Sequence, residues 1–134
     1  MSVVRTYIVE DNPVILNNLR DTLEELTSVQ VMGTAADEAS AVDSLRKDPR
    51  GMDLVIIDVF LASGSGLSVL RSAQELNVQA RRVVLTNYAT PDIRRRCTAL
   101  GADRVFDKSS EIEDLIDYCG GIADGTASMP AALR

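Results

Sequence analysis

Polar side chains suited to phosphoryl chemistry follow four of the five short apolar runs in the chain. Glu10 and Asp11 follow the first run, Asp58 the third, Thr86 the fourth and Lys108 the fifth. Carboxylate oxygens bind Mg²⁺, which takes one or two of them together with waters and a phosphate oxygen. A hydroxyl and an ammonium group can hold the oxygens of a tetrahedral anion. If the fold brings these residues together, they predict a metal-assisted site for a phosphoryl group.

The loop after the first run argues against a nucleotide as the source of that phosphoryl group. The chain carries no Gly-x-x-x-x-Gly-Lys-Ser/Thr loop, and Glu-Asp-Asn-Pro stands where a dinucleotide-binding fold has its glycines. A carboxylate beside a metal ion can itself act as the nucleophile in group transfer. We therefore expect an acid of the site to take the phosphoryl group from a donor other than a bound nucleotide.

The elements that must position these residues alternate between strand and helix. The third apolar run, Leu-Val-Ile-Ile, is continuous, as in a parallel strand that helices cover on both faces. The predicted strands are residues 3–9, 29–34, 54–57, 83–85 and 104–107, and a segment of helical periodicity follows each. This pattern predicts a single α/β domain with a five-stranded parallel sheet and helices on both faces. We take the strand order to be 2-1-3-4-5, the doubly wound, flavodoxin-like arrangement in which the chain builds outward from the first strand.

The strand order decides which polar residues can meet. In an open parallel sheet, ligands bind at the carboxyl ends of the strands, where the strand order reverses. In the order 2-1-3-4-5 the reversal lies between the first and third strands, so Asp11 and Asp58 are expected to face each other. Together with Glu10 they would repel unless a cation neutralises them, and we therefore expect Mg²⁺ there.

Capping residues mark the expected ends of the helices. Asn12 before Pro13 and Thr90 before Pro91 predict helix starts, and Ser110 with Glu113 predicts a capping box for the last helix. Gly120-Gly121 is expected to end that helix. Residues 1–121 are therefore predicted to form the domain, and residues 122–134 a flexible tail or the start of a linker.

Composition excludes several classes of protein. The chain has 134 residues, a formal charge of −6, two cysteines and no histidine. Without histidine there is no Ser-His-Asp triad, and Cys97 and Cys119 are expected to be ordinary buried thiols. The acidic balance argues against direct nucleic-acid binding, and no run approaches the ~20 apolar residues of a membrane span. We expect a cytoplasmic domain.

The strand-end residues together resemble the receiver domain of bacterial two-component response regulators. Glu10-Asp11, Asp58, Thr86 and Lys108 carry the resemblance, which extends over about residues 3–119. Gly66 and the segment Leu-Thr-Asn-Tyr-Ala from residue 85 are also similar to the family. The resemblance implies a signalling domain, not an enzyme with a turned-over substrate, that catalyses only its own aspartyl phosphorylation and dephosphorylation.

The resemblance also implies a role for each residue. Asp58 would accept a phosphoryl group from a phosphohistidine on a sensor histidine kinase or phosphotransfer protein, and Thr86 and Lys108 would contact its oxygens. Glu10, Asp11, Asp58 and the backbone carbonyl of Phe60 would hold Mg²⁺. A downstream protein would bind the face made by the fourth helix, fifth strand and fifth helix, and a homodimer is compatible with this reading.

Four positions depart from the family pattern. Glu10 stands where Asp is commonest, Ala62 and Ser109 stand where proline is frequent, and Val105 stands where the family usually carries Tyr or Phe. That aromatic ring commonly swings inward when the threonine moves toward the phosphoryl group. We interpret Tyr88 as a rim residue that takes part of its role.

Two other functions fit parts of the pattern. The departures at Val105, Ala62 and Ser109 suit a receiver-fold interaction module that works without phosphorylation. A phosphatase of the haloacid dehalogenase type would need a second Asp two residues after Asp58, where Phe60 stands. The basic run of residues 94–96 reads either as a solvated helix face or as a docking surface.

Overall fold

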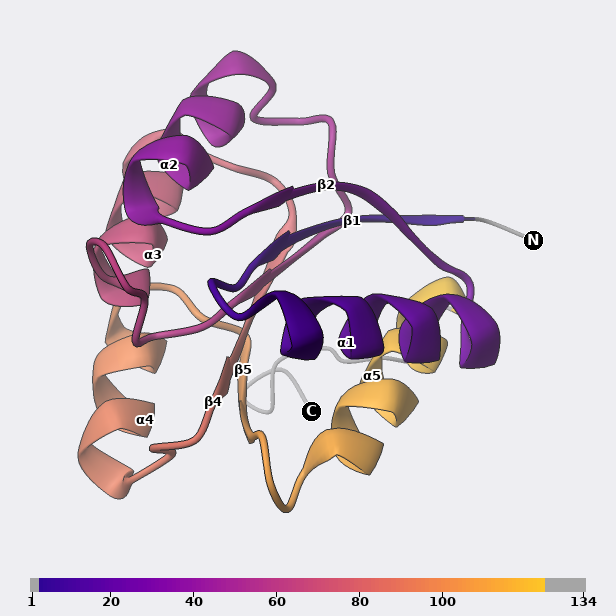
Figure 1. Ribbon diagram of the computed structural model, residues 1–134. Helices are drawn as coiled ribbons and strands as arrows, with labels where there is room; N and C mark the ends of the chain where they lie inside the picture. The colour runs from indigo at the N-terminus through magenta and orange to yellow at the C-terminus, as the bar shows by residue number, and fades with distance from the viewer. Residues whose placement is uncertain (1–2, 125–134) are drawn as a thin grey trace.

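A computed structural model of the chain describes residues 3–124. Its strands are β1 (Val4–Val9), β2 (Val29–Ala35), β3 (Leu54–Ile57), β4 (Arg81–Thr86) and β5 (Arg104–Asp107). Its helices are α1 (Pro13–Leu26), α2 (Glu38–Lys47), α3 (Gly66–Glu75), α4 (Pro91–Ala99) and α5 (Ile112–Asp124). All strand pairs are parallel and the order is β2-β1-β3-β4-β5, as the sequence predicts (Figure 1).

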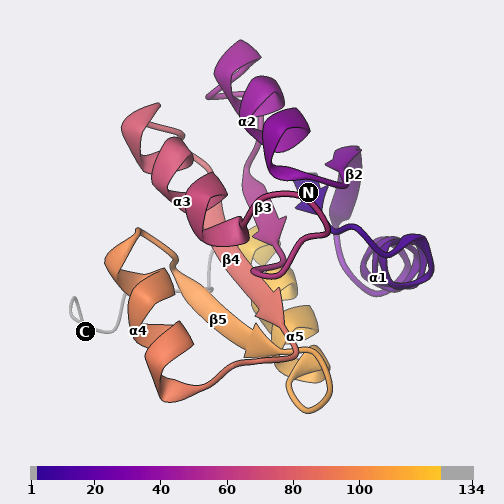
Figure 2. The ribbon, with the colours of Figure 1, turned by 60° about the vertical axis from the view of Figure 1, so that its left-hand side comes forward.

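Helices cover both faces of the sheet. Helices α1 and α5 lie on one face, and α2, α3 and α4 on the other (Figure 2). The side chains of β3 alternate between these two layers: Leu54 and Ile56 pack in the core beneath α1 and α5, while Val55 and Ile57 pack in the core beneath the other three helices. Because both faces are covered, all four side chains are buried, and the run is apolar without alternation.

Local signals start the helices close to the carboxyl edge of the sheet. The Asn12 side chain accepts hydrogen bonds from the backbone N–H groups of Val14 and Ile15, and the Thr90 hydroxyl accepts one from Ile93. Gly66 begins α3, where a Cβ would collide with the backbone carbonyl oxygen of Asp58. The loops after β1 and β4 are therefore short, and they hold the polar residues near the ends of these strands.

The last helix differs from the prediction at both ends. It begins at Ile112, and the Leu115 N–H donates to the Glu111 carbonyl, so Glu111 and not Ser110 directly precedes the helix. Ser110 is held instead by its N–H, which donates to the Asp107 carboxylate. It continues through Gly120-Gly121 to Asp124 because Ile122 packs against the core beneath α1 and α5, which offsets the low helix propensity of glycine. The predicted end at Gly120-Gly121 is wrong, and the rest of the predicted tail, 125–134, lies outside the described residues.

Within residues 3–124, none of the helices combines the length and apolar character that crossing a membrane requires.

Candidate functional site

The pairing of β1 with β3 brings the acidic residues together. Val9 lies opposite Ile57 in the register of the two strands, so Glu10 and Asp58, the residues that follow, leave the sheet side by side. The Asp58 N–H donates to the Val9 carbonyl at 2.9 Å and fixes this arrangement. Carboxylate oxygens of Glu10, Asp11 and Asp58 all lie within 4.8 Å of one another. The predicted acidic cluster is therefore present.

Lys108 compensates part of this negative charge. Its Nζ lies 2.6 Å from Glu10 Oε1 and 3.0 Å from Asp58 Oδ2. Lys108 directly follows β5, so its side chain reaches past the end of β4 to make these contacts. The side chains of Lys108, Glu10 and Asp58 are 10%, 3% and 7% exposed. Buried charges are costly unless paired, so these contacts hold the three side chains in place.

These contacts and the burial of the site shift the pKa values of Lys108 and Glu10. Burial by itself would lower the pKa of Lys108, but its hydrogen bonds to Glu10 and Asp58 outweigh that effect, and the pKa is raised. Burial raises the pKa of the Glu10 carboxyl, and the hydrogen bond from Lys108 opposes the rise only in part. The lysine is therefore a fixed positive charge at the end of the sheet.

The donor set fits a small divalent cation. Three carboxylates with one lysine leave a surplus of negative charge, and all the donors are oxygens, the ligands that Mg²⁺ prefers. Phe60, whose backbone carbonyl is the fourth predicted ligand, is held beside Asp58 by its own N–H, which donates to Asp58 Oδ1 at 3.3 Å. Its carbonyl as a ligand stays a prediction.

Thr86 and Lys108 share a cavity with the acids. The cavity has a volume of about 210 Å³ and is lined by residues of the β1, β3, β4 and β5 ends, including Asp11, Asp58, Thr86 and Lys108. Thr86 is fully buried, and its hydroxyl oxygen accepts a hydrogen bond from the Tyr88 N–H at 3.2 Å. That bond leaves the hydroxyl hydrogen available to a guest oxygen. The site can thus present a donor, an ammonium and a carboxylate to one tetrahedral group.

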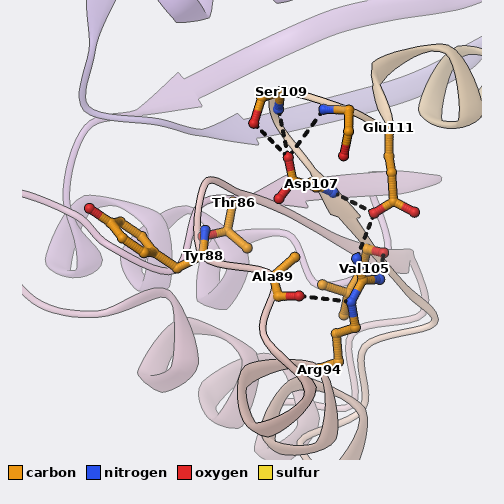
Figure 3. A network of polar contacts seen from close by, with 9 residues as sticks. Thr86, Tyr88, Ala89, Arg94, Val105, Asp107, Ser109 and Glu111 are labelled. Atoms are coloured by element: carbon orange, nitrogen blue, oxygen red, sulfur yellow. Dashed lines mark hydrogen bonds and ion pairs between the residues drawn. The ribbon is translucent and has the colours of Figure 1, made fainter.

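Two exposed aromatic rings stand at the rim of this cavity. Phe60 and Tyr88 are 51% and 60% exposed, and their rings meet edge to face with centroids 4.9 Å apart. Figure 3 shows the Tyr88 ring pointing away from Val105. Tyr88 thus lines the cavity, and its interpretation as a partial replacement for the missing ring stays a prediction.

The loop after Asp58 depends on a residue that sequence reasoning missed. Glu38, the first residue of α2, accepts a hydrogen bond from the Ser65 N–H through Oε1 at 2.9 Å, and its own N–H donates to the Ser63 carbonyl at 3.2 Å. These bonds tie the loop that contains Ala62 to α2. Nothing local marks Glu38 for this role, since the contact joins residues 27 positions apart.

A second missed pair lies beside Val105. Arg94 bonds to Glu111 at 2.6 Å, although the sequence offers Arg94 only as part of a basic run. Helical spacing places Arg94 on α4, but no sequence signal connects it to the beginning of α5.

Comparison with known proteins gives one consistent result. A family model described as the response regulator receiver domain matches residues 6–119. The nitrate/nitrite response regulator protein NarP of Escherichia coli is 30% identical over 123 residues, which are 91% of this chain and 56% of that protein. A protein-glutamate methylesterase/protein-glutamine glutaminase of Methanospirillum hungatei is 26% identical over 88% of this chain and 34% of its own length. The chain thus spans about a third to just over half of these relatives.

Solved structures share the fold. A two-component response regulator of the LuxR family from Aurantimonas sp. SI85-9A1 superposes with a TM-score of 0.83 at 23% identity, covering 98% of this chain and 93% of that one. The signal receiver domain of the putative response regulator NarL from Mycobacterium tuberculosis has a TM-score of 0.81 at 19% identity and covers 96% of this chain and all of its own.

Proposed function

Because the chain belongs to the response regulator receiver domain family, we propose that Asp58 accepts a phosphoryl group from a phosphohistidine of a partner protein. One observation carries the proposal: the Asp58 carboxylate lies in the cavity with two other carboxylates, and the Lys108 ammonium is 3.0 Å away. The chain has no histidine, so the phosphohistidine must lie outside these 134 residues. A sensor histidine kinase or a phosphotransfer protein has this chemistry.

The transfer is a single displacement at phosphorus. An Asp58 oxygen forms the new O–P bond while the P–N bond of the phosphohistidine breaks, and its electron pair stays on the imidazole nitrogen. Lys108 stabilises the negative charge on the phosphoryl oxygens, and the Thr86 hydroxyl hydrogen is available to orient them. Hydrolysis by water later returns the Asp58 carboxylate and releases phosphate.

Glu10, Asp11, Asp58 and the Phe60 carbonyl would hold Mg²⁺ in this reaction. When bound, Mg²⁺ supplies positive charge against both the carboxylates and the phosphoryl oxygens. The surplus of carboxylates over lysine supports this role, because the cluster without a cation keeps uncompensated negative charge.

Phosphorylation then alters a protein-binding face, which we place on α4, β5 and α5. The covalent group adds negative charge next to Lys108 and Thr86, at the ends of β5 and β4. The partner would be a downstream protein or a second copy of the chain, in the cytoplasm. The net charge of −6 argues against direct contact with nucleic acid.

A small phosphodonor tests the assignment. With Mg²⁺ and acetyl phosphate, the chain should gain the mass of one phosphoryl group, and hydroxylamine should remove it. Asp58→Asn should abolish the gain, whereas Asp92→Asn, a change of an exposed acid on α4, should leave it intact. An adduct that persists in Asp58→Asn would overturn the proposal. Equal affinity for a partner with and without beryllofluoride would favour a module that works without phosphorylation.

A further inference from the structure

Arg94 connects three elements through a single guanidinium group (Figure 3). Nε donates to the Ala89 carbonyl at 3.0 Å, Nη1 to the Val105 carbonyl at 3.0 Å, and Nη2 to Glu111 Oε1 at 2.6 Å. Ala89 belongs to the loop after β4, Val105 to β5, and Glu111 directly precedes α5. The planar, forked arrangement of donors in arginine suits acceptors on several elements at once.

The neighbouring arginines behave differently. Arg95 and Arg96 form their ion pairs with Asp92 of the same helix, at 3.4 and 3.0 Å, and their side chains are 73% and 62% exposed. Arg94 is only 40% exposed. The basic run is therefore not one uniform surface: two members lie on a solvated helix face, and one reaches the neighbouring strand and helix.

The connection reaches both loops that carry the phosphoryl-contacting residues. Ala89 lies three residues after Thr86, in the loop that must shift if Thr86 moves toward a group on Asp58. At the other end, Glu111 Oε1 also accepts a hydrogen bond from the Asp107 N–H at 2.8 Å, next to Lys108. The Glu111 carbonyl accepts from the Leu115 N–H in the first turn of α5. A displacement of the loop after β4 is therefore transmitted through Arg94 to Glu111, whose side chain holds the Asp107 N–H next to Lys108.

We propose that Arg94 is the positioning residue through which movement of the Thr86–Thr90 loop reaches β5 and the first turn of α5. Val105 has no aromatic ring that could move in response to Thr86. Arg94 contacts this same position, because its Nη1 donates to the backbone carbonyl of Val105. This inference rests on the proposed function of Asp58. It assigns to the side chain of Arg94 the coupling between the phosphoryl site and the α4–β5–α5 face.

Amide NMR of the full chain with Mg²⁺ and beryllofluoride, an analogue of the aspartyl phosphate, tests the coupling. In the unsubstituted chain, amides of Thr86–Tyr88 and of Asp107–Leu115 should both shift. In Arg94→Ala the shifts near Thr86 should remain, and those at the beginning of α5 should be lost. Arg94→Lys should not restore them, because an ammonium group cannot bridge all three acceptors.

Arg95→Ala is the matched control, since it removes the same residue type from the same helix without touching the loop, and it should keep both sets of shifts. If Arg94→Ala does not fold, Glu111→Ala breaks the same connection by removing the oxygen that accepts from both Arg94 Nη2 and the Asp107 N–H, and it should also lose the α5 shifts. Shifts at α5 equal to those of the unsubstituted chain in these variants would overturn the coupling. A lack of shifts near Thr86 in the unsubstituted chain would overturn the proposed function and this inference with it.

Discussion

The charged residues at the two ends of the sheet differ in burial and in the balance between acidic and basic groups. At the amino end, Arg5 on β1 and Asp53 before β3 form one balanced pair: the Arg5 N–H and Nε both donate to Asp53 Oδ2, at 2.8 and 3.2 Å. Their side chains are 48% and 37% exposed. At the carboxyl end, one lysine pairs with two of three clustered acids, and these contacts are almost completely buried.

The difference separates a structural pair from a cluster that could hold a cation. A balanced, solvated pair contributes little and needs no ligand. A buried cluster with surplus negative charge is costly in free energy. Binding of a cation, or a change of charge on one of the acids, alters that cost. The same kinds of residue therefore hold two strands together at one end and could hold a cation at the other.

The largest effect is expected when the basic residue at each end of the sheet is replaced. Lys108→Met should lower the free energy of unfolding by about 3 kcal/mol, because it leaves two buried carboxylates unpaired. Arg5→Met should change it by less than about 1 kcal/mol, as for other exposed pairs. Urea unfolding at pH 7 without Mg²⁺ measures both, and equal losses would remove the distinction between the two ends.

Mg²⁺ should distinguish the two ends next. At a free concentration ten times the dissociation constant, a bound ion should stabilise the chain by about 1.4 kcal/mol. Asp11→Asn should abolish most of this gain, since it removes one of the three clustered carboxylates. Asp53→Asn is the control at the other end and should keep the gain. A gain that depends on Asp53 and not on Asp11 would contradict the predicted site.

The aromatic rim should affect how long the phosphoryl group persists. Phe60→Ala with Tyr88→Ala should speed hydrolysis by about threefold, or about 0.65 kcal/mol in activation free energy, because water reaches Asp58 more easily. Met32→Ala removes a similarly exposed apolar side chain on β2, outside the residues that line the cavity, and should leave the rate unchanged. Loss of the phosphoryl group can be followed by mass, and an unchanged lifetime in the double variant would exclude this role for the rings.

The smallest expected effect is the pH dependence of the amino-end pair. The hydrogen bond from Arg5 lowers the pKa of the Asp53 carboxyl. A carboxyl whose folded pKa is lowered stabilises the fold fully above its unfolded value, near 3.9, and loses that contribution as the pH falls through the folded value. Across that acid range, the free energy of unfolding should depend less steeply on pH in Asp53→Asn than in the unsubstituted chain. Arg5→Met should show the same change. A slope that neither variant alters would show that the pair does not contribute.

Much of the fold follows from the sequence because its signals are local. The runs at residues 54–57 and 104–107 predict β3 and β5 with the observed bounds, and Asn12 and Thr90 cap α1 and α4 as expected. The end of α5 could not be predicted from Gly120-Gly121. The helix continues past these glycines because Ile122 packs against core residues that are distant in the sequence. Local propensity loses there to tertiary burial.

The acidic site could be predicted in part because a parallel sheet brings the carboxyl ends of its strands to one edge. Residue types at strand ends therefore indicate from the sequence alone that Glu10, Asp11, Asp58, Thr86 and Lys108 are neighbours. The same reasoning misses Glu38 and the pairing of Arg94 with Glu111. Those contacts depend on where long side chains on helices reach, for which the sequence has no periodic signal.

The sequence by itself thus determined the elements, their order along the chain and the kinds of group at each strand end, because backbone propensity, capping and burial act over a few residues. Only the tertiary structure decided that Lys108 pairs directly with Glu10, 98 residues away, and that Arg94 leaves the solvated helix face to connect β5 with Glu111 before α5. Such contacts depend on strand register and on the packing of helices against the sheet, and these are properties of the whole domain.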